Sequence, residues 1–418
     1  MKSSWMAALA TVATIGCGAQ PLQLGGEGSG GATTPIGTAG TTGVADATGS
    51  AGTTGATGAA GATGTAGSTG FSMSPSGTAG APGSGLPISD AELARRLARF
   101  IWAAPPDADL LNRIALSAPQ TRQDVDFIAA TMLKDPRARD GATVFYRKWL
   151  DLDQFATVTK DPALFPEFTP ALRDDMIGEA LQFALYVTFD GDGRFPTLFT
   201  AEFSFLDAPL AAIYGVDGVT GAERVLTMLD PDQRSGVLTL PAVLGNVYNS
   251  DLPPVTARGR FAYGLEVGNF LAGPTMVPMI PPTATQTTRD WLASLLQAAT
   301  CAACHSRLDP VGLAFLNYDA LGRFSTTERG MPVDDTGSWS YDGGTSSMTF
   351  HGARGLADIF ASSTDARDGF VGQWLALAVG VVNDTTSLQQ AIDAFVANNL
   401  DIPSLIAAVT TTDAFLAP

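Results

Sequence analysis

Residues 301–312 read CAACHSRLDPVG, and the first five, Cys301-Ala302-Ala303-Cys304-His305, have the pattern C-x-x-C-H. Two thiols one helical turn apart can add to the two vinyl groups on one edge of a porphyrin, and the imidazole beside them then reaches the iron. Covalent attachment holds a haem even where little protein covers it. We therefore predict one covalent haem c on Cys301 and Cys304, with His305 as the proximal iron ligand.

Three other uses of this motif compete with haem attachment. A thioredoxin-like dithiol is expected beside a βαβ pattern, which the sequence does not show. A structural zinc site needs four ligands, and there is no second Cys/His pair near this one. A disulfide between Cys301 and Cys304 closes a very short loop and leaves His305 unexplained. The chain has two histidines, His305 and His351, so a Ser-His-Asp triad would have to use one of them. We therefore do not expect hydrolase chemistry of that type.

The N-terminus has the pattern of a secretory signal. Lys2 supplies a positive charge, and the apolar run Trp5–Ile15 is too short to cross a bilayer. The run ends in Thr14-Ile15-Gly16-Cys17, which resembles a lipoprotein cleavage site. We expect residues 1–17 to be a lipoprotein-type signal and Cys17 to be the lipidated residue; ordinary cleavage nearby is the alternative. Gly18 after the cysteine implies, by the same resemblance, the outer membrane of a Gram-negative envelope.

Residues 18–86 are rich in Gly, Thr, Ala and Ser, with almost no charge and hardly any large apolar side chain. Such a segment cannot bury enough surface to offset the entropy lost on ordering. We predict a disordered linker. It would serve as a tether that holds the folded part away from a membrane, or as a spacer without a selected length.

Helical patterns dominate from residue 87 onward. Ser89 and Glu92 form a capping-box pattern, and Thr169-Pro170 combines an N-cap with proline at the first helical position. No alternation indicates a substantial sheet. We predict a mainly α fold with three parts: a helical domain at 87–224, a middle Pro-rich and helical domain at 225–285, and a cytochrome c-like haem-motif domain at 286–418. Further helices are expected at 108–116, 122–134, 138–152, 261–271, 368–379, 386–398 and 403–408.

The charge balance limits the partners. The chain has 24 Lys and Arg against 41 Asp and Glu, a formal net charge of -17. Nucleic-acid binding depends on clustered cations that neutralise phosphates. We therefore expect no nucleic-acid partner.

A family resemblance extends these predictions. The segment from Cys301 to Arg323, including Asp309-Pro310, Gly312 and Asn317-Tyr318-Asp319, closely resembles the C-terminal module of multidomain proteins from planctomycetes and myxobacteria. That module reads C-x-x-C-H…DP-x-G…N-[FY]-D-x-x-G-R, and Leu308 stands where methionine is common. Upstream segments resemble the helical and middle domains of the same family, so the resemblance covers about 90–418. It implies haem and export but no substrate. The upstream segments are 94–102, 106–107, 161–168, 205–215, 236–238, 254–259 and 402–415.

We also predict neighbours of the motif. Met348 is our candidate for the sixth iron ligand, and Met331 and His351 are the other residues considered for that position. On a strand, Met348 and Phe350 share one face and His351 takes the other. A plain core role for Met348, with an open iron position, is the alternative. Asp309-Pro310 and Gly312 are expected to form the turn after His305.

Two arginines and a set of aromatic residues complete the expected neighbourhood of the haem. Arg258 and Arg323 are candidates for a haem propionate, with an i,i+4 pair of Asp319 and Arg323 as the simpler reading. Five aromatic residues are expected to form a core that packs against the haem: Phe315, Tyr318, Phe324, Trp339 and Phe350.

The function that these observations favour is single-haem electron transfer in the cell envelope, with a redox partner that the sequence does not name and with a lipid anchor to the membrane. A haem enzyme or sensor with an open iron position is the second hypothesis, and it differs by lacking a sixth protein ligand. A binding or scaffold module stabilised by haem is the third. The sequence leaves open whether the protein is an enzyme.

Overall fold

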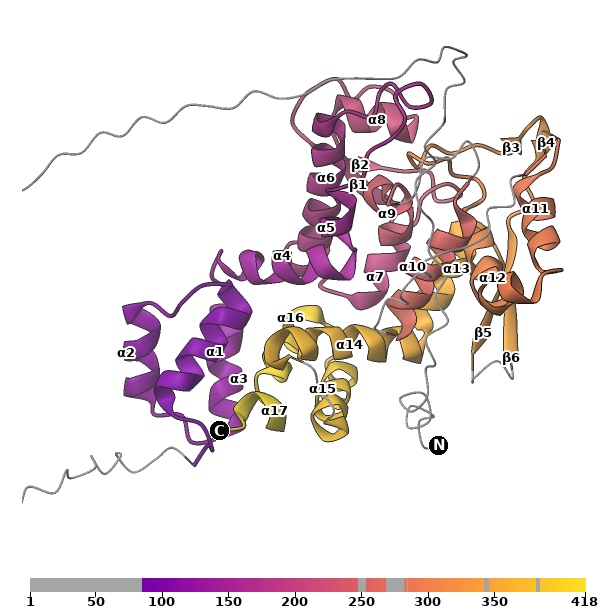
Figure 1. Ribbon diagram of the computed structural model, residues 1–418. Coiled ribbons are helices and arrows are strands. Elements are labelled where there is room, and N and C mark those ends of the chain that lie inside the picture. Colours follow the sequence, from indigo (N-terminus) through magenta and orange to yellow (C-terminus); the bar gives the residue numbers. More distant parts are fainter. Residues whose placement is uncertain (1–84, 247–252, 268–281, 284, 342–345, 381–383) are drawn as a thin grey trace, which may run out of the picture. The chain divides into compact units, whose positions relative to one another are not determined.

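A computed structural model describes residues 85–418, except 247–252, 268–281, 284, 342–345 and 381–383, and within these residues the fold is mainly helical, as predicted (Figure 1). The predicted signal, its Cys17 and the linker up to residue 84 lie outside the described residues. Among the helices that are described, none combines the length and the apolar character needed to cross a membrane.

The first helix starts at its predicted cap, Ser89. The hydroxyl of Ser89 accepts a hydrogen bond from the Glu92 backbone N–H at 3.3 Å, and α1 follows. Glu92 does not complete the box, because its carboxylate pairs with Arg96 at 2.8 Å instead. The first five helices of the described chain are α1 (Asp90–Trp102), α2 (Ala108–Ser117), α3 (Arg122–Met132), α4 (Ala138–Trp149) and α5 (Leu152–Phe155).

The long helix α6 (Pro170–Phe189) also begins as predicted, with the Thr169 hydroxyl accepting from the Leu172 N–H at 3.1 Å and Pro170 in the first turn. The segment after it contains short elements that the sequence did not predict. They are α7 (Phe195–Thr200), β1 (Phe203–Leu206), α8 (Ala208–Tyr214), β2 (Val225–Met228), the 3-10 helix η2 (Gly236–Thr239) and α9 (Pro241–Leu244).

The second half of the chain carries the C-x-x-C-H motif on a helix. One expectation is wrong here: Asp309, Pro310 and Gly312 do not form a turn after His305 but belong to the same helix, α12. The elements are α10 (Val255–Val267), α11 (Thr288–Leu295), α12 (Ala299–Gly312), η3 (Leu313–Phe315), β3 (Thr327–Glu328), β4 (Met331–Pro332), β5 (Thr336–Tyr341), β6 (Ser346–His351), α13 (Gly352–Ser362), α14 (Thr364–Val379), α15 (Thr385–Ala397), α16 (Ile402–Val409) and α17 (Asp413–Leu416).

Strands contribute little. Within the described residues the sheets are the antiparallel pairs β1–β2, β3–β4 and β5–β6. In β5–β6, Trp339 lies opposite Met348 and Gly337 lies opposite Phe350. This register confirms that residues 348–351 are a strand with alternating faces.

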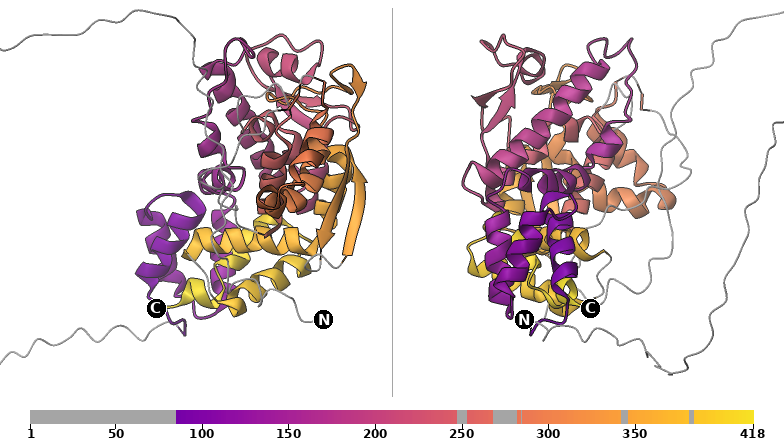
Figure 2. Two further views of the ribbon diagram at one scale, coloured as in Figure 1. Left: turned by 45° about the vertical axis from the view of Figure 1, so that its right-hand side comes forward. Right: turned by 90° about the vertical axis from the view of Figure 1, so that its left-hand side faces the viewer.

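A large apolar cluster, which we call the main core, joins both ends of the described chain. Phe145 of α4 stacks on Trp374 of α14, with 3.7 Å between the ring centroids and 7° between the planes. Phe370 meets Phe145 edge-on at 5.3 Å. Figure 2 shows the early and late helices side by side. The described residues fall into one compact unit by their contacts. The predicted domain boundaries at residues 224 and 285 stay a prediction.

Candidate functional site

The motif occupies the first two turns of α12. Cys301 is buried and Cys304 is half-buried, and both thiols are free. The His305 side chain is 13% exposed. A helix brings residues three and four positions apart onto one face, so α12 presents both thiols and the imidazole along one side.

The position of α12 is fixed by a very close crossing with α10, and the two helices lie side by side in Figure 1. A Cβ atom added to Gly259 would lie 2.0 Å from the Leu308 carbonyl oxygen, and one added to Gly312 would lie 2.0 Å from the Val255 carbonyl oxygen. Only glycine allows the backbones to approach this closely. The two glycines therefore set the register of α12 against α10.

This crossing brings a threonine of α10 to the histidine. The His305 Nδ1 lies 2.8 Å from Asp309 Oδ2, one helical turn later. The Thr256 hydroxyl donates to the other carboxylate oxygen, Asp309 Oδ1, at 2.6 Å, and its Oγ1 lies 3.3 Å from His305 Nδ1. The Asp309 side chain is 8% exposed.

The hydrogen bonds assign the tautomer of His305. A carboxylate only accepts, and the single Thr256 proton is directed to Asp309, so the proton of the neutral imidazole belongs on Nδ1. The lone pair is then on Nε2. A metal-bound histidine is typically held in this way, with its other ring N–H donated to a carboxylate or carbonyl.

A small apolar cluster surrounds the first thiol, and we call it the Cys301 cluster. Its buried members are Val255, Leu292, Leu295, Cys301 and Leu316. It is separate from the main core and draws on α10, α11 and α12. Trp291 and Leu313 pack on it from partly exposed positions.

The donor set fits a c-type haem. Covalent haem attachment uses two thiols at this spacing and the histidine that follows them, and both thiols are free here. The contact of His305 Nδ1 with Asp309 is of the kind that orients a metal-bound histidine. Nowhere in the described chain do three or more His, Cys, Asp or Glu side chains form a group that could hold a bare metal ion. A haem needs fewer protein ligands, because the porphyrin supplies four nitrogens itself.

Comparison with protein families finds two matches, which cover separate parts of the chain. Residues 88–216 match the family PSD4, described as "Protein of unknown function (DUF1592)". Residues 234–328 match the family PSCyt3, described as "Protein of unknown function (DUF1588)". The second match contains α10, α11 and α12, so the C-x-x-C-H motif lies inside it. No curated protein and no solved structure matches the chain.

Of the three candidates for the sixth ligand, Met348 and His351 lie on β6 and Met331 lies on β4. Met348 is 48% exposed, opposite the buried Trp339. The His351 side chain is 75% exposed, with its Nδ1 3.2 Å from the Thr336 hydroxyl. The role of Met348 at the iron stays a prediction.

The two arginines proposed for a haem propionate have protein partners. The buried guanidinium of Arg258 donates to the carbonyls of Leu244, Phe315, Tyr318 and Asp319. Arg323 binds Asp319 at 2.6 Å and also Glu167. The simpler reading of the Asp319–Arg323 pair is therefore confirmed, although a turn and not a helix brings the two together. Through these hydrogen bonds Arg258 holds the segment after α12 in place.

The five aromatic residues expected around the haem are mostly buried, but in the main core. Phe315, Tyr318, Trp339 and Phe350 belong to that cluster, and Phe324 packs on it. Trp339 meets Phe360 of α13 with 4.9 Å between centroids. These side chains anchor the segment after α12 to the main core and are not members of the Cys301 cluster.

A buried acid that sequence reasoning missed lies in the main core. Glu179 of α6 accepts hydrogen bonds from the Ser204 hydroxyl at 2.5 Å and from the Tyr214 phenol. Burial raises the pKa of Glu179 to about 7, and the two hydrogen bonds offset only part of that effect. The helical period of α6 indicates a buried position at 179, but no sequence pattern identifies its partners.

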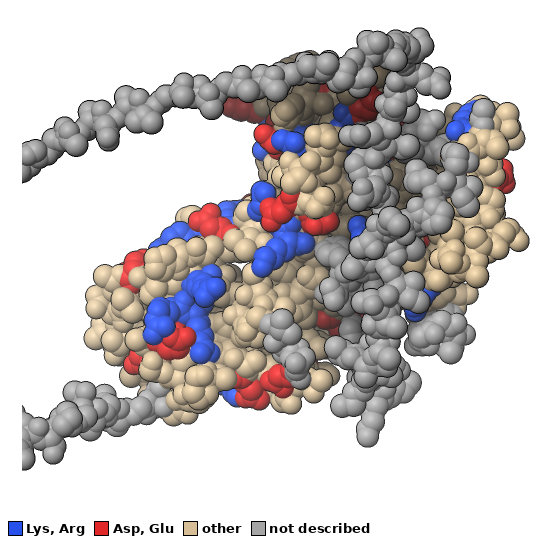
Figure 3. Space-filling model, in the orientation of Figure 1, with Lys and Arg blue, Asp and Glu red and all other residues tan. Residues whose placement is uncertain are grey.

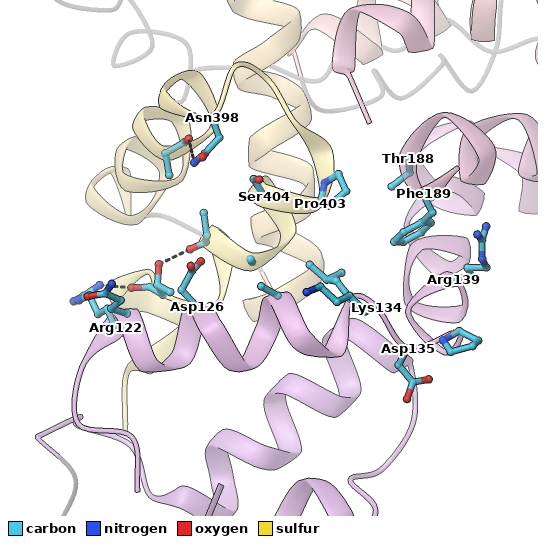
Figure 4. A pocket seen from close by; sticks show the side chains of 18 residues that line it. Arg122, Asp126, Lys134, Asp135, Arg139, Thr188, Phe189, Asn398, Pro403 and Ser404 are labelled. Atoms are coloured by element: carbon cyan, nitrogen blue, oxygen red, sulfur yellow. Dashed lines mark hydrogen bonds between the residues drawn. The ribbon is translucent and has the colours of Figure 1, made fainter. Parts of the chain in front are cut away.

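A cavity of about 830 Å³ lies away from the motif, among α3, α4, α6, α15 and α16 (Figure 4). Its lining includes Arg122, Lys134 and Arg139, but no residue of α10 or α12. Arg122 pairs with Asp413, and Arg139 pairs with Asp190 at 2.5 Å. On the face in Figure 3, basic side chains lie beside acidic ones in the same manner. The cavity lining contains no Cys or His. We therefore assign no catalytic or metal-binding role to this cavity.

Proposed function

We propose that this protein is a c-type haem protein of the cell envelope that transfers single electrons. Cys301 and Cys304 would bind the haem through thioether bonds, and His305 would bind the iron through Nε2. The observation that carries the proposal is the combination of the motif on α12 with the hydrogen bond from His305 Nδ1 to Asp309, 2.8 Å long. This hydrogen bond leaves the lone pair of Nε2 free to bind a metal.

The protein's own residues have separate tasks at this site. When bound, haem supplies an iron that gains and loses one electron. Asp309 and Thr256 orient the imidazole, Gly259 and Gly312 hold α12 against α10, and the Cys301 cluster shields the thiol edge from water. An electron carrier needs little rearrangement between its two states, and a ligand held from two helices supplies that rigidity.

The test is covalent attachment. We expect the chain, produced in an exported form together with a haem-attachment system, to keep its colour through denaturing electrophoresis and to show the mass of one haem. The paired change Cys301→Ser and Cys304→Ser should remove both. The matched control is Cys17→Ser, which keeps the motif and should keep the colour. A colourless wild-type chain with the bare mass would overturn the proposal.

The sixth ligand separates electron transfer from an open-site enzyme or sensor. We propose Met348, because thioether ligation suits a carrier of raised potential. The oxidised protein should show the weak near-infrared thioether–iron band, and Met348→Ala should abolish it while His351→Ala retains it. The 48% exposure of Met348 favours the second candidate, an open iron position. Ready binding of carbon monoxide by the reduced wild type would support that candidate.

The location in the envelope rests on the N-terminal pattern alone. We propose that Cys17 is lipidated and anchors the mature chain to a membrane, through the linker of residues 18–86. The wild type should fractionate with membranes, and Cys17→Ser should release it. A soluble wild type whose N-terminus lies beyond Cys17 would contradict the anchor without affecting the haem proposal.

We propose that the chain is a member of the planctomycete and myxobacterial multidomain haem proteins, whose C-terminal module the segment from Cys301 to Arg323 resembles. Two adjacent family matches, at residues 88–216 and 234–328, support a shared order of domains.

A further inference from the structure

Asp309 is the charged group in direct contact with the candidate iron ligand. It follows His305 by four residues on α12, and its Oδ2 lies 2.8 Å from the imidazole Nδ1. Both side chains are largely buried, with 13% of His305 and 8% of Asp309 exposed. At this degree of burial, water competes little for the hydrogen bond, so the bond is directional and lasting.

The carboxylate is itself held by a second helix. Thr256 of α10 donates its hydroxyl proton to Asp309 Oδ1 at 2.6 Å. With one oxygen bound by Thr256 and the other by His305, Asp309 cannot turn away without breaking two hydrogen bonds. The glycine contacts of Gly259 and Gly312 keep the two helices at the distance that this arrangement needs.

The geometry points to Asp309 as a positioning residue that sets the electron-donating strength of His305. A carboxylate that accepts the Nδ1 proton increases the electron density on Nε2 and makes the imidazole a stronger base. A stronger ligand stabilises the oxidised iron more than the reduced iron. Asp309 therefore lowers the reduction potential of the site, and this inference rests on the proposed haem function.

Thr256 limits the effect of Asp309. A hydrogen bond donated to one carboxylate oxygen draws charge away from the other, so Asp309 is a weaker acceptor for His305 than an unpaired carboxylate would be. The two residues thus act in opposite directions on the same imidazole. The reduction potential would thus be lower than with a histidine that has no carboxylate partner, and Thr256 of α10 limits the size of that shift.

The experiment is a potentiometric titration of the haem-loaded full chain. Asp309→Asn keeps the shape of the side chain and removes its charge. We expect covalent haem to remain and the midpoint potential to rise by at least a tenfold change in the reduction equilibrium, about 59 mV for one electron. The control Asp290→Asn removes one negative charge from the neighbouring helix α11 without touching His305, and its potential should equal that of the wild type.

Three outcomes decide between the explanations. An Asp309→Asn protein that keeps its haem but not a raised potential would overturn this inference and leave the proposed function intact. A wild type without covalent haem would overturn both. If Asp309→Asn does not fold, Thr256→Val replaces it: the freed carboxylate should lower the potential, with Thr256→Ser at the wild-type value. An unchanged or raised potential in Thr256→Val would contradict the inference.

Discussion

The main core and the Cys301 cluster differ in what fills them. The main core contains the largest fully buried side chains of the described chain, among them Trp149, Trp374 and Phe145, in stacked and edge-on pairs. The Cys301 cluster has five buried residues, four aliphatic side chains and one thiol, with an aromatic ring, Trp291, only at its partly exposed margin. Burial of apolar surface stabilises a protein by about 25 cal/mol per Å², so the two clusters contribute very unequally.

The two regions are therefore held together by different interactions. The main core is built from large buried side chains of the described chain. Around the motif, the close crossing of α10 and α12 and the hydrogen bonds of Thr256 and Asp309 hold the structure where apolar packing is sparse. A covalently attached porphyrin would add apolar surface where the chain offers least.

The largest effect is expected at the centre of the main core. Phe145→Ala removes the ring that stacks on Trp374 and should lower the free energy of unfolding by about 3–5 kcal/mol. Phe127→Ala is the control, because its ring is 74% exposed, and its effect should stay within about 0.5 kcal/mol. Urea unfolding followed by tryptophan fluorescence measures both. Equal losses of stability in Phe145→Ala and Phe127→Ala would show that Phe145 does not lie in a packed core.

A pH-dependent loss of stability should also originate in the main core. The folded-state pKa of Glu179 is raised to about 7 from its ordinary value of 4.5. Between these values the folded protein binds a proton that the unfolded chain does not, so the free energy of unfolding falls as the pH rises through this window. The loss is about 3 kcal/mol at 1.36 kcal/mol per pH unit.

Glu179→Gln should remove this dependence, so the wild type should lose stability relative to the variant between pH 4.5 and pH 7. Urea unfolding at both pH values measures the difference. Glu223→Gln, at an exposed position, is the control and should follow the wild type. A constant difference between wild type and Glu179→Gln would show that Glu179 does not titrate in this window.

A smaller effect is expected where α10 and α12 cross. Gly259→Ala places a Cβ 2.0 Å from the Leu308 carbonyl oxygen, and the helices must separate. We expect a loss of about 1–3 kcal/mol, together with faster hydrogen exchange in α12 than in α14. Gly372→Ala is the matched control inside a helix: its Cβ would meet Leu388 at 3.8 Å.

That control should be neutral or gain up to about 1 kcal/mol, because alanine favours helix more than glycine does. Equal losses in Gly259→Ala and Gly372→Ala would show that the crossing is not close. Faster exchange in the main core than in α12 after Gly259→Ala would reverse the contrast between the two regions.

The smallest effect is a difference in thiol reactivity that leaves stability unchanged. In the folded chain without haem, Cys304 should react with iodoacetamide faster than Cys301, because Cys301 is buried and Cys304 is half-buried. Mass spectrometry of timed samples measures the two rates, and urea should equalise them. Faster reaction of Cys301 in the folded chain would mean that the Cys301 cluster is open.

The sequence predicted the long helices well because their signals are local. The cap at Thr169 and the proline after it start α6 where predicted. Prediction failed at Asp309-Pro310, where a typical turn pattern lies inside α12. A proline in a helix loses one hydrogen bond, and here the contacts of Asp309 with His305 and of Gly312 with Val255 keep the helix continuous.

The candidate site was predictable only in its linear part. Cys301, Cys304 and His305 are adjacent in sequence, and the four-residue spacing of His305 and Asp309 would have indicated their pairing had the helix been extended past Pro310. Thr256 comes from another helix, about fifty residues earlier, and its contact with Asp309 is tertiary. Local patterns carry no information on such a contact.

The burial of Cys301 would constrain the order of events if haem is attached there. Once α11 and α12 have closed around this thiol, 4% of the residue remains exposed, too little for an attachment enzyme to reach. A bond from Cys301 to haem would therefore have to form while the segment is still open, before the helices dock. Cys304 stays accessible for longer. The yield of haem-loaded protein would therefore depend on how the rate of haem delivery compares with the rate at which α11 and α12 dock.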